Sequence, residues 1–239
     1  RESDYWKSIE FSLMEKAAVS YYPSYVEEEA IHAIHPEYKI RAITAYVYEK
    51  FLENIDKDCE KREGLLFVGG FAHPPNADAV LWFAKEIFPL IRQKLDVNFY
   101  VVGSKVTDEI KALEQPGSGI IVKGFVTEEE LASLYATSRI VVVPLRYGAG
   151  VKGKVVEAVY NGSAIVTTSI GSEGIPEAAR VMKVADGPEA FADEVVKMYQ
   201  DPAECRRMCE ETQKYIREYF SVEAAWKVIE GDFTPEKKR

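Results

Sequence analysis

Two lysines and a glutamate follow a glycine-rich loop in the second half of the chain. Lys152, Lys154 and Glu157 belong to the stretch PLRYGAGVKGKVVEA (residues 144–158), in which an apolar, strand-like run leads through the loop into a predicted helix. Cations at the start of a helix oppose its dipole, so their presence indicates an anion to be bound. Backbone N–H groups in such a loop can bind phosphate, and the stretch therefore predicts a phosphate site. The alternative is a solvated helix start whose lysines pair with nearby acids.

A second glycine-marked loop, GGFAHPPN (residues 69–76), follows the first predicted strand of the same region, whereas the lysine-rich loop follows the fourth. In a doubly wound parallel sheet with the usual strand order 3-2-1-4-5-6, the first and fourth strands are neighbours and flank the ligand-binding crevice. The two loops should therefore meet at that crevice, beyond the carboxyl ends of the strands.

The elements that must position these loops follow a regular pattern. Short apolar runs alternate with amphipathic ones from residue 61 onward, which is typical of an α/β protein whose parallel sheet is covered on both faces. We therefore predict an α/β fold with a doubly wound, Rossmann-like parallel sheet. The predicted strands are residues 65–68, 97–102, 119–124, 140–143, 163–168 and 180–185. The predicted helices include residues 76–95, 107–113, 127–135, 187–200, 202–219 and 222–229, with Asn76 capping the first and Thr127 with Glu130 forming a capping box.

The first sixty residues are too few for a complete α/β domain, and we expect a partial leading α/β segment there. The charged stretch at residues 53–63 lacks apolar periodicity and predicts a linker. Because the chain begins at Arg1 rather than at a methionine, we expect it to be a fragment of a longer protein. The predicted elements of the leading segment are helices at residues 8–18 and 24–34 and strands at residues 19–22 and 39–44.

Composition narrows the function classes. The chain has 239 residues, 30 basic and 39 acidic, for a net charge of −9, which argues against a nucleic-acid binder. The three cysteines show no metal-ligand spacing, and no apolar run has membrane-spanning length. We therefore expect a cytoplasmic protein with no transmembrane segment. His32 and His35 lie in the leading segment, where we interpret them as structural.

Several motifs together resemble a known family. The resemblance is to the C-terminal domain of retaining GT-B glycosyltransferases of the family 4 type, and it covers roughly residues 64–201. It implies an enzyme with two Rossmann-like domains, in which the C-terminal domain binds a nucleoside diphosphate sugar and the N-terminal domain binds most of the acceptor. The motifs are FVGGF (residues 67–71), PN (75–76), VKGF (122–125), the stretch 144–158 and VTTSIGSEG (166–174).

The resemblance implies a division of the chain into three parts. Residues 1–55 correspond to a remnant of the N-terminal, acceptor-binding domain with its linker. Residues 56–205 correspond to the donor-binding domain. Residues 206–239 correspond to C-terminal helices that cross back toward the N-terminal domain. The rest of that domain would be missing here, so we expect the isolated chain to be inactive.

The resemblance also assigns site residues. Lys154, with Lys152 beside it, corresponds to the basic position at the donor diphosphate, and Glu157 to the acid that binds the ribose hydroxyls. Gly69 and Gly70 correspond to the loop at the diphosphate and sugar, and Gly124, Phe125 and Val126 to the turn at the base. Glu173, after the fifth strand, and Gly150, in the lysine-rich loop, complete the predicted donor site.

Two positions depart from the family pattern. Ala149 stands where many relatives have a glutamate that contacts the sugar, and FAHPP (residues 71–75) replaces a loop that often carries Arg and Lys. His73, Arg146 and Lys152 are the residues available to compensate. The identities of the sugar and the base therefore stay open.

The function implied is transfer of a glycosyl unit, such as a hexose, from a nucleoside diphosphate sugar to an unidentified carbohydrate or lipid-linked acceptor in carbohydrate biosynthesis. No cofactor or metal is expected, and the sequence identifies no nucleophile or general base. Any peripheral contact with a membrane would come from the missing part. Two alternatives stay open, namely a non-catalytic nucleotide-binding or interaction domain, and another GT-B-like enzyme such as a sugar epimerase or phosphorylase.

Overall fold

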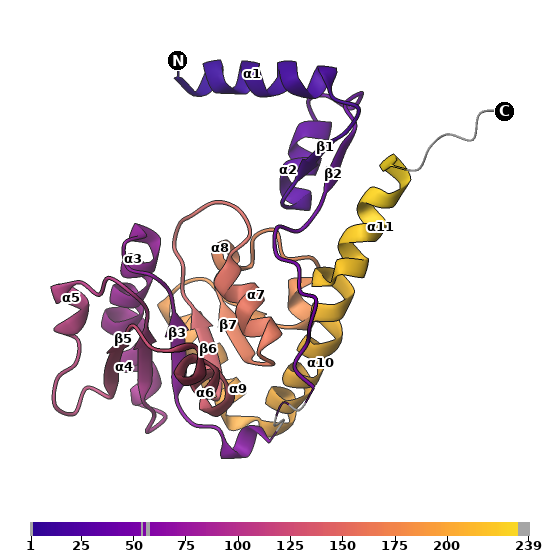
Figure 1. Ribbon diagram of the computed structural model, residues 1–239. Coiled ribbons are helices and arrows are strands. Elements are labelled where there is room, and N and C mark those ends of the chain that lie inside the picture. Colours follow the sequence, from indigo (N-terminus) through magenta and orange to yellow (C-terminus); the bar gives the residue numbers. More distant parts are fainter. Residues whose placement is uncertain (1, 54, 56–57, 234–239) are drawn as a thin grey trace.

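The computed structural model describes residues 2–53, 55 and 58–233, and its larger part is a three-layer α/β domain (Figure 1). The six strands of its sheet are all parallel and lie in the order β5-β4-β3-β6-β7-β8. This is the predicted doubly wound order 3-2-1-4-5-6, with β3 and β6 side by side at the centre. The strands are β3 (Leu65–Val68), β4 (Phe99–Val102), β5 (Ile120–Gly124), β6 (Ile140–Val143), β7 (Ala164–Thr167) and β8 (Lys183–Val184).

Helices cover both faces of the sheet. On one face, α3 (Pro74–Trp82) continues through a π-helical turn (Phe83–Ile87) into α4 (Phe88–Arg92), and α9 (Pro188–Gln200) packs against them. On the other face, α10 (Pro202–Phe220) packs against α7 (Gly153–Tyr160). The remaining helices are α5 (Asp108–Lys111), α6 (Glu128–Thr137), α8 (Ser169–Ser172) and α11 (Val222–Phe233), with 3₁₀ turns at Cys59–Lys61 and Ala178–Arg180.

The core lies between these layers and explains why the strands are almost wholly apolar. Every residue of β6 is buried, as expected for a parallel strand that is covered on both faces. Aromatic rings join the layers, since Phe83 packs against Phe99 of β4 at 4.6 Å and against Phe191 of α9 at 5.9 Å between ring centroids. The sheet is therefore a rigid frame for the loops at its carboxyl edge.

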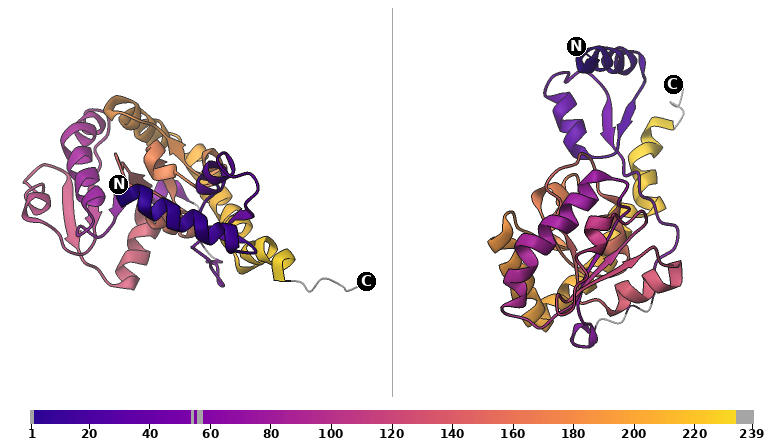
Figure 2. Two further views of the ribbon diagram at one scale, coloured as in Figure 1. Left: turned by 90° about the horizontal axis from the view of Figure 1, so that it is seen from above. Right: turned by 90° about the vertical axis from the view of Figure 1, so that its left-hand side faces the viewer.

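The leading segment is a separate small α/β unit. It consists of α1 (Glu2–Lys16), β1 (Ser20–Tyr22), α2 (Tyr25–His32) and β2 (Ile40–Ala42), and its two strands are parallel. This confirms the predicted partial leading segment, which Figure 2 shows standing off from the main domain. Its own core is small and is formed by Met14, Ile31 and Ile40.

The C-terminal helix α11 contacts this leading segment. Its Asp232 accepts a 2.7 Å hydrogen bond from the Tyr21 hydroxyl and forms an ion pair with Arg41 at 2.8 Å. Both ends of the described chain therefore lie on the same side of the main domain (Figure 1). Between the leading segment and the main domain, residues 43–53 run as an extended linker.

The structure corrects some predicted elements and confirms others. Asn76 does not cap a helix, because α3 begins at Pro74 with His73 as its N-cap, and a proline is well suited to a first helical turn. The sixth strand is only Lys183–Val184, since Arg180 lies in a 3₁₀ turn. The capping box of Thr127 and Glu130 is present at the start of α6. The predicted domain boundary at residues 55 and 56, and residues 234–239, fall partly or wholly outside the described residues.

Close backbone contacts hold the loops at the carboxyl edge. Gly103, after β4, donates to the Gly124 carbonyl at 2.8 Å, and Gly69, after β3, donates to the Val102 carbonyl at 2.9 Å. A Cβ atom on Gly103 would lie 1.9 Å from the Gly69 oxygen, and the Gly103 φ is +153°. Only glycine allows the loop after β3 to take this position.

We expect Gly103→Ala to destabilise the fold by roughly 3 kcal/mol or more, because the methyl group displaces the loop after β3. Gly117→Ala is the matched control, since Gly117 has φ +80° but no neighbouring atom within 4 Å. It should cost only about 1–2 kcal/mol of backbone strain. Urea unfolding of both variants measures the difference, and equal stability of the two would contradict the close-contact argument.

Candidate functional site

The two predicted loops meet where expected, beyond the ends of β3 and β6. Together with the first turn of α7 they line a cavity of about 200 Å³, which we call the lysine cavity. Its volume and its mixed polar lining fit a small anionic group. It is lined by His73, Pro75, Asn76, Leu145, Tyr147, Gly148, Ala149, Val151, Lys152, Gly153 and Lys154.

Lys154 lies at the centre of this arrangement. Its ammonium donates a hydrogen bond to the Asn76 side-chain oxygen and lies 4.7 Å from the centroid of the Phe67 ring. A Cβ atom on Gly69 would be 2.8 Å from Nζ, so the glycine makes room for the ammonium. Asn76 also donates from its amide nitrogen to the Gly70 carbonyl at 2.8 Å. One asparagine therefore holds both the lysine and the loop after β3.

The two lysines of the cavity have different partners. Lys152 donates to the Glu173 carboxylate at 2.9 Å and to the Gly150 carbonyl, so for this residue the ion-pair alternative holds. Lys154 has no carboxylate partner within the described ranges, and its bond goes to a neutral amide rather than to Glu157. Burial, and then the charge of Lys152, lower the pKa of Lys154 to about 8. A partly buried ammonium of this kind is stabilised by an incoming anion.

Glu157 lies one helical turn further along α7 and faces a second cavity of about 400 Å³, which we call the tyrosine cavity. Burial raises the pKa of the Glu157 carboxyl, and the nearby Tyr135 hydroxyl lowers it by a smaller amount. The distance and angle between the two groups do not meet the criteria for a hydrogen bond. The two cavities share Gly153 and so adjoin at the N-terminus of α7. The tyrosine cavity is lined by Tyr46, Tyr48, Gly153, Glu157, Tyr160 and Asn161.

The structure brings most predicted site residues together, but not all of them. Arg146 forms a bidentate ion pair with Asp78 and stacks on the Trp82 ring at 5.4 Å, so it is directed toward α3. Phe125 is 82% exposed, and its turn lines neither cavity. Gathered at or beside the lysine cavity are Gly69, Gly70, His73, Gly150, Lys152, Lys154 and Glu173, with Glu157 in the adjoining cavity; Gly124, Phe125, Val126 and Arg146 lie outside both.

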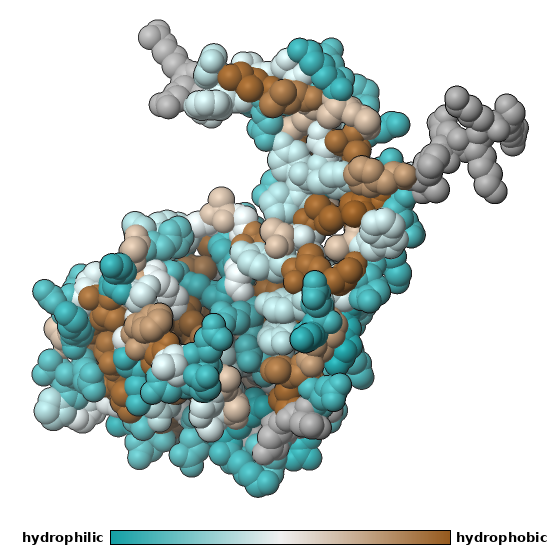
Figure 3. Space-filling view, in the orientation of Figure 1, coloured by the Kyte–Doolittle hydropathy of each residue, from teal (hydrophilic) through white to brown (hydrophobic). Residues whose placement is uncertain are grey.

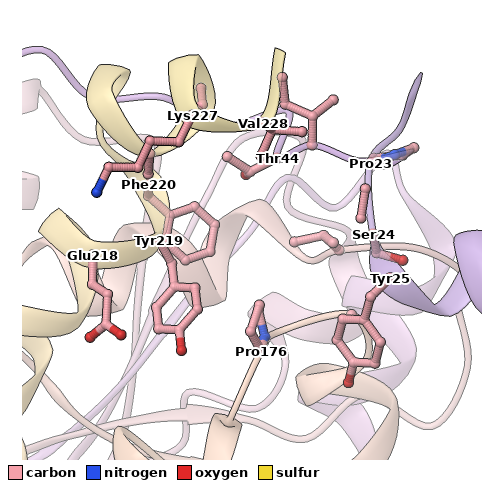
Figure 4. A pocket seen from close by; sticks show the side chains of 16 residues that line it. Pro23, Ser24, Tyr25, Thr44, Pro176, Glu218, Tyr219, Phe220, Lys227 and Val228 are labelled. Atoms are coloured by element: carbon pink, nitrogen blue, oxygen red, sulfur yellow. The ribbon is translucent and has the colours of Figure 1, made fainter. Parts of the chain in front are cut away.

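A third cavity of about 230 Å³ lies between the leading segment and helices α10 and α11 (Figure 4). Its walls are mostly apolar and contain none of the predicted donor-site residues. Ser24 of the leading segment packs there so closely that a Cβ atom on Gly174 would lie 2.8 Å from the Ser24 Cβ. The leading segment therefore contacts the residue next to Glu173.

A family profile for glycosyl transferases group 1 matches residues 62–201, which is more than half of the chain. The chain belongs to the glycosyltransferase group 1 family. An uncharacterized 44.6 kDa protein in the cps region of Klebsiella pneumoniae is 26% identical over 163 residues, which are 65% of this chain and 42% of that protein. This group 1 domain chain thus spans less than half the length of that curated relative.

Solved structures show the same fold at low identity. A mutant of S. aureus TarM in complex with Fondaparinux, alpha-GlcNAc-glycerol and UDP matches with a TM-score of 0.71 and 14% identity, covering 91% of this chain and 44% of that one. Sucrose-phosphate synthase from Thermosynechococcus elongatus matches with a TM-score of 0.69 and 20% identity, covering 95% of this chain and 60% of that one. These likenesses place the glycosyltransferase group 1 chain in the GT-B, Rossmann-like fold.

Several residues at these cavities have a role that the sequence does not predict. The sequence predicts Asn76 as a helix cap, whereas in the structure its side chain bonds to Lys154 and to the Gly70 carbonyl. Tyr46 and Tyr48 lie in the linker, about a hundred residues before the helix they face, and only the fold joins them to Glu157. In the described part of the chain, no group of three or more His, Cys, Asp or Glu residues is placed to hold a metal ion. No helix of residues 2–233, where described, is long and apolar enough to span a membrane.

The unusual environment of Lys154 predicts a pH-dependent stability. Its pKa is about 8 in the fold against 10.5 for an ordinary lysine, so between these values the unfolded chain binds more protons. The Lys154 contribution to the free energy of unfolding should therefore rise with pH from about 8 to 10.5, by up to about 3 kcal/mol. Urea unfolding of the native chain and of Lys154→Met, measured from pH 7 to pH 10, gives this contribution as a difference.

Lys123→Met is the control for that experiment, because it removes an exposed lysine and so reports the general effect of charge. A difference between the native chain and Lys154→Met that stays constant across this pH range would show that the ammonium is not buried as described.

Proposed function

We propose that this chain is the donor-binding half of a retaining glycosyltransferase of the family 4 type. It would bind a nucleoside diphosphate sugar across the N-terminus of α7 and take part in moving the sugar to a carbohydrate or lipid-linked acceptor. The family membership supports sugar transfer, and the resemblance of the motifs supports the retaining type.

The observation that carries this proposal is the uncompensated Lys154 ammonium at a helix N-terminus. Lys152 lies beside it. The first backbone N–H groups of α7 are directed out of the helix N-terminus, and the helix dipole also favours an anion there. A diphosphate in the lysine cavity would be met by both side chains and the helix N-terminus. Glu157, in the adjoining cavity, is placed to accept hydrogen bonds from ribose hydroxyls.

This arrangement also suggests a catalytic role for the lysines. When the bond between the sugar C1 and the diphosphate oxygen breaks, negative charge develops on the leaving diphosphate. Lys154, Lys152 and the α7 N-terminus would stabilise that charge, and preorganised groups of this kind can lower a barrier by several kcal/mol. No metal is needed for this step as proposed. The structure assigns no nucleophile or general base.

The acceptor side would come from further protein. We propose that residues 1–55 end an N-terminal domain, that residues 56–205 bind the donor, and that residues 206–239 return to the N-terminal domain. The ion pair of Arg41 with Asp232 supports this return. Apolar side chains also gather along α1 on the face seen in Figure 3. Among the residues of this helix, Tyr5 and Trp6 are 60% exposed and Leu13 is 65% exposed, as expected if further protein packs there. A cytoplasmic location remains part of the proposal.

Titration calorimetry of point variants tests the proposed ligand. UDP is the first probe, because the TarM crystal contains it, with GDP and ADP tested in parallel. Lys154→Ala should weaken the diphosphate roughly 10- to 100-fold, as expected for a charge-assisted contact, and leave uridine almost unchanged. Glu157→Gln should weaken UDP and uridine by similar factors, because both contain ribose.

Lys123→Ala is the control, since it removes an exposed lysine that lines neither cavity. It should leave UDP affinity unchanged. Absence of binding of all three nucleoside diphosphates by the native chain at millimolar concentration would refute the proposed donor site. Equal losses of UDP and uridine affinity in Lys154→Ala would instead remove the phosphate role of this lysine.

A further inference from the structure

The linker from the leading segment passes directly over the start of α7. A Cβ atom on Gly153, the first residue of α7, would lie 2.8 Å from the Tyr46 hydroxyl oxygen and 2.9 Å from a carbon of its ring. Gly153 is not among the glycines with positive φ, so its backbone could accommodate another residue. The glycine is needed because Tyr46 lies against it.

Tyr46 is held in this place by its neighbours in the linker. Its backbone N–H donates to the Thr44 hydroxyl at 3.1 Å. Two residues later, the Tyr48 N–H donates to the Phe220 carbonyl at 2.8 Å, and the Tyr48 ring stacks on Tyr160 of α7 at 4.3 Å between centroids. The linker is therefore fixed between α7 and the end of α10.

One wall of the tyrosine cavity is formed by tyrosine side chains. Burial, and then the charge of Glu157, raise the pKa of Tyr48 to about 12. The Tyr46 hydroxyl has no hydrogen-bond partner within the described ranges, so it can donate to a ligand. Tyr46, Tyr48 and Tyr160 thus give the tyrosine cavity an aromatic lining beside the Glu157 carboxylate.

Gly153 is common to the lysine cavity and the tyrosine cavity. Because both cavities include Gly153, a ligand that occupies the two of them would lie beside this glycine and beside Tyr46. On the basis of the proposed function, we propose that Tyr46 is a donor-binding residue contributed by the linker. Its hydroxyl donates a hydrogen bond to the donor where the nucleoside joins the diphosphate, while Tyr48 and Tyr160 form the wall beside the ribose.

The proposal differs from the family-based expectation that the turn at Phe125 contacts the base. The two can be separated, because Phe125 is exposed and lies outside both cavities, whereas Tyr46 lines the tyrosine cavity. If Tyr46 binds the donor, part of the donor site lies in the linker, outside the main domain. Donor binding would then depend on how the linker is held by Thr44 and Phe220.

The test compares Tyr46→Phe, which removes only the hydroxyl, with Tyr46→Ala and with the native 239-residue chain in calorimetric titrations with UDP. Tyr46→Phe should bind UDP roughly 10- to 100-fold more weakly, the range expected for one hydrogen bond to a charged phosphate oxygen. Tyr46→Ala should bind at least as weakly. Tyr5→Phe is the matched control, because Tyr5 is 60% exposed on α1, and its UDP affinity should equal that of the native chain.

A second measurement separates contact from a structural effect. Nitration of tyrosines by tetranitromethane, followed by mass spectrometry, should show that UDP protects Tyr46 but not Tyr5. UDP binding that is unchanged in both Tyr46 variants, with no protection, would overturn the proposal while leaving the proposed function intact. Unchanged UDP affinity in both Tyr46 variants together with weaker binding in Phe125→Ala would also overturn it, in favour of the turn after β5. If the native chain binds no nucleoside diphosphate, the proposed function fails and the role of Tyr46 fails with it.

Discussion

The site depends on one constraint, the partial burial of the Lys154 ammonium at the N-terminus of α7 with no carboxylate partner among the described residues. Burial, and then the charge of Lys152, lower the pKa of Lys154 to about 8, and the helix dipole is also unfavourable for a cation at this end of α7. The fold tolerates this because Asn76 accepts a hydrogen bond from the ammonium and the Phe67 ring lies beneath it. An anion in the lysine cavity would offset these unfavourable contributions to the charge of Lys154. The arrangement is therefore suited to binding an anion.

The surrounding structure serves this constraint through close backbone contacts. Gly69 leaves space for the ammonium, and Gly103 allows the loop after β3 to lie near the end of β4. Gly153 allows the linker to cross the start of the same helix, and Gly174 allows Ser24 to approach beside Glu173. Two of these four contacts come from residues before the main domain. The leading segment and the linker are therefore in physical contact with the site. A change in their position would alter the surroundings of Lys152 and Gly153.

The sequence predicted the fold well because buried parallel strands are nearly continuous apolar runs, and their order follows from the alternation with helices. It also predicted that the two glycine-marked loops meet. The sequence did not predict partners that lie far away along the chain. Asn76 has the features of a helix cap but its side chain accepts a hydrogen bond from Lys154. Arg146 follows the fourth strand but pairs with Asp78 of α3. Local pattern carries no information about such partners. Tyr46 could not be found for the same reason, since its position depends on how the linker packs.

A crystal structure of the chain with UDP would test most directly whether a diphosphate lies across the N-terminus of α7. We expect phosphate oxygens within hydrogen-bonding distance of Lys154 Nζ and of the first α7 amides, with the ribose hydroxyls at Glu157. The hydrogen bond from Lys154 to Asn76 should then be replaced by one to phosphate, or shared with it. A UDP molecule bound elsewhere, for example in the apolar cavity beside Tyr25 and Tyr219, with the lysine cavity unchanged, would contradict it.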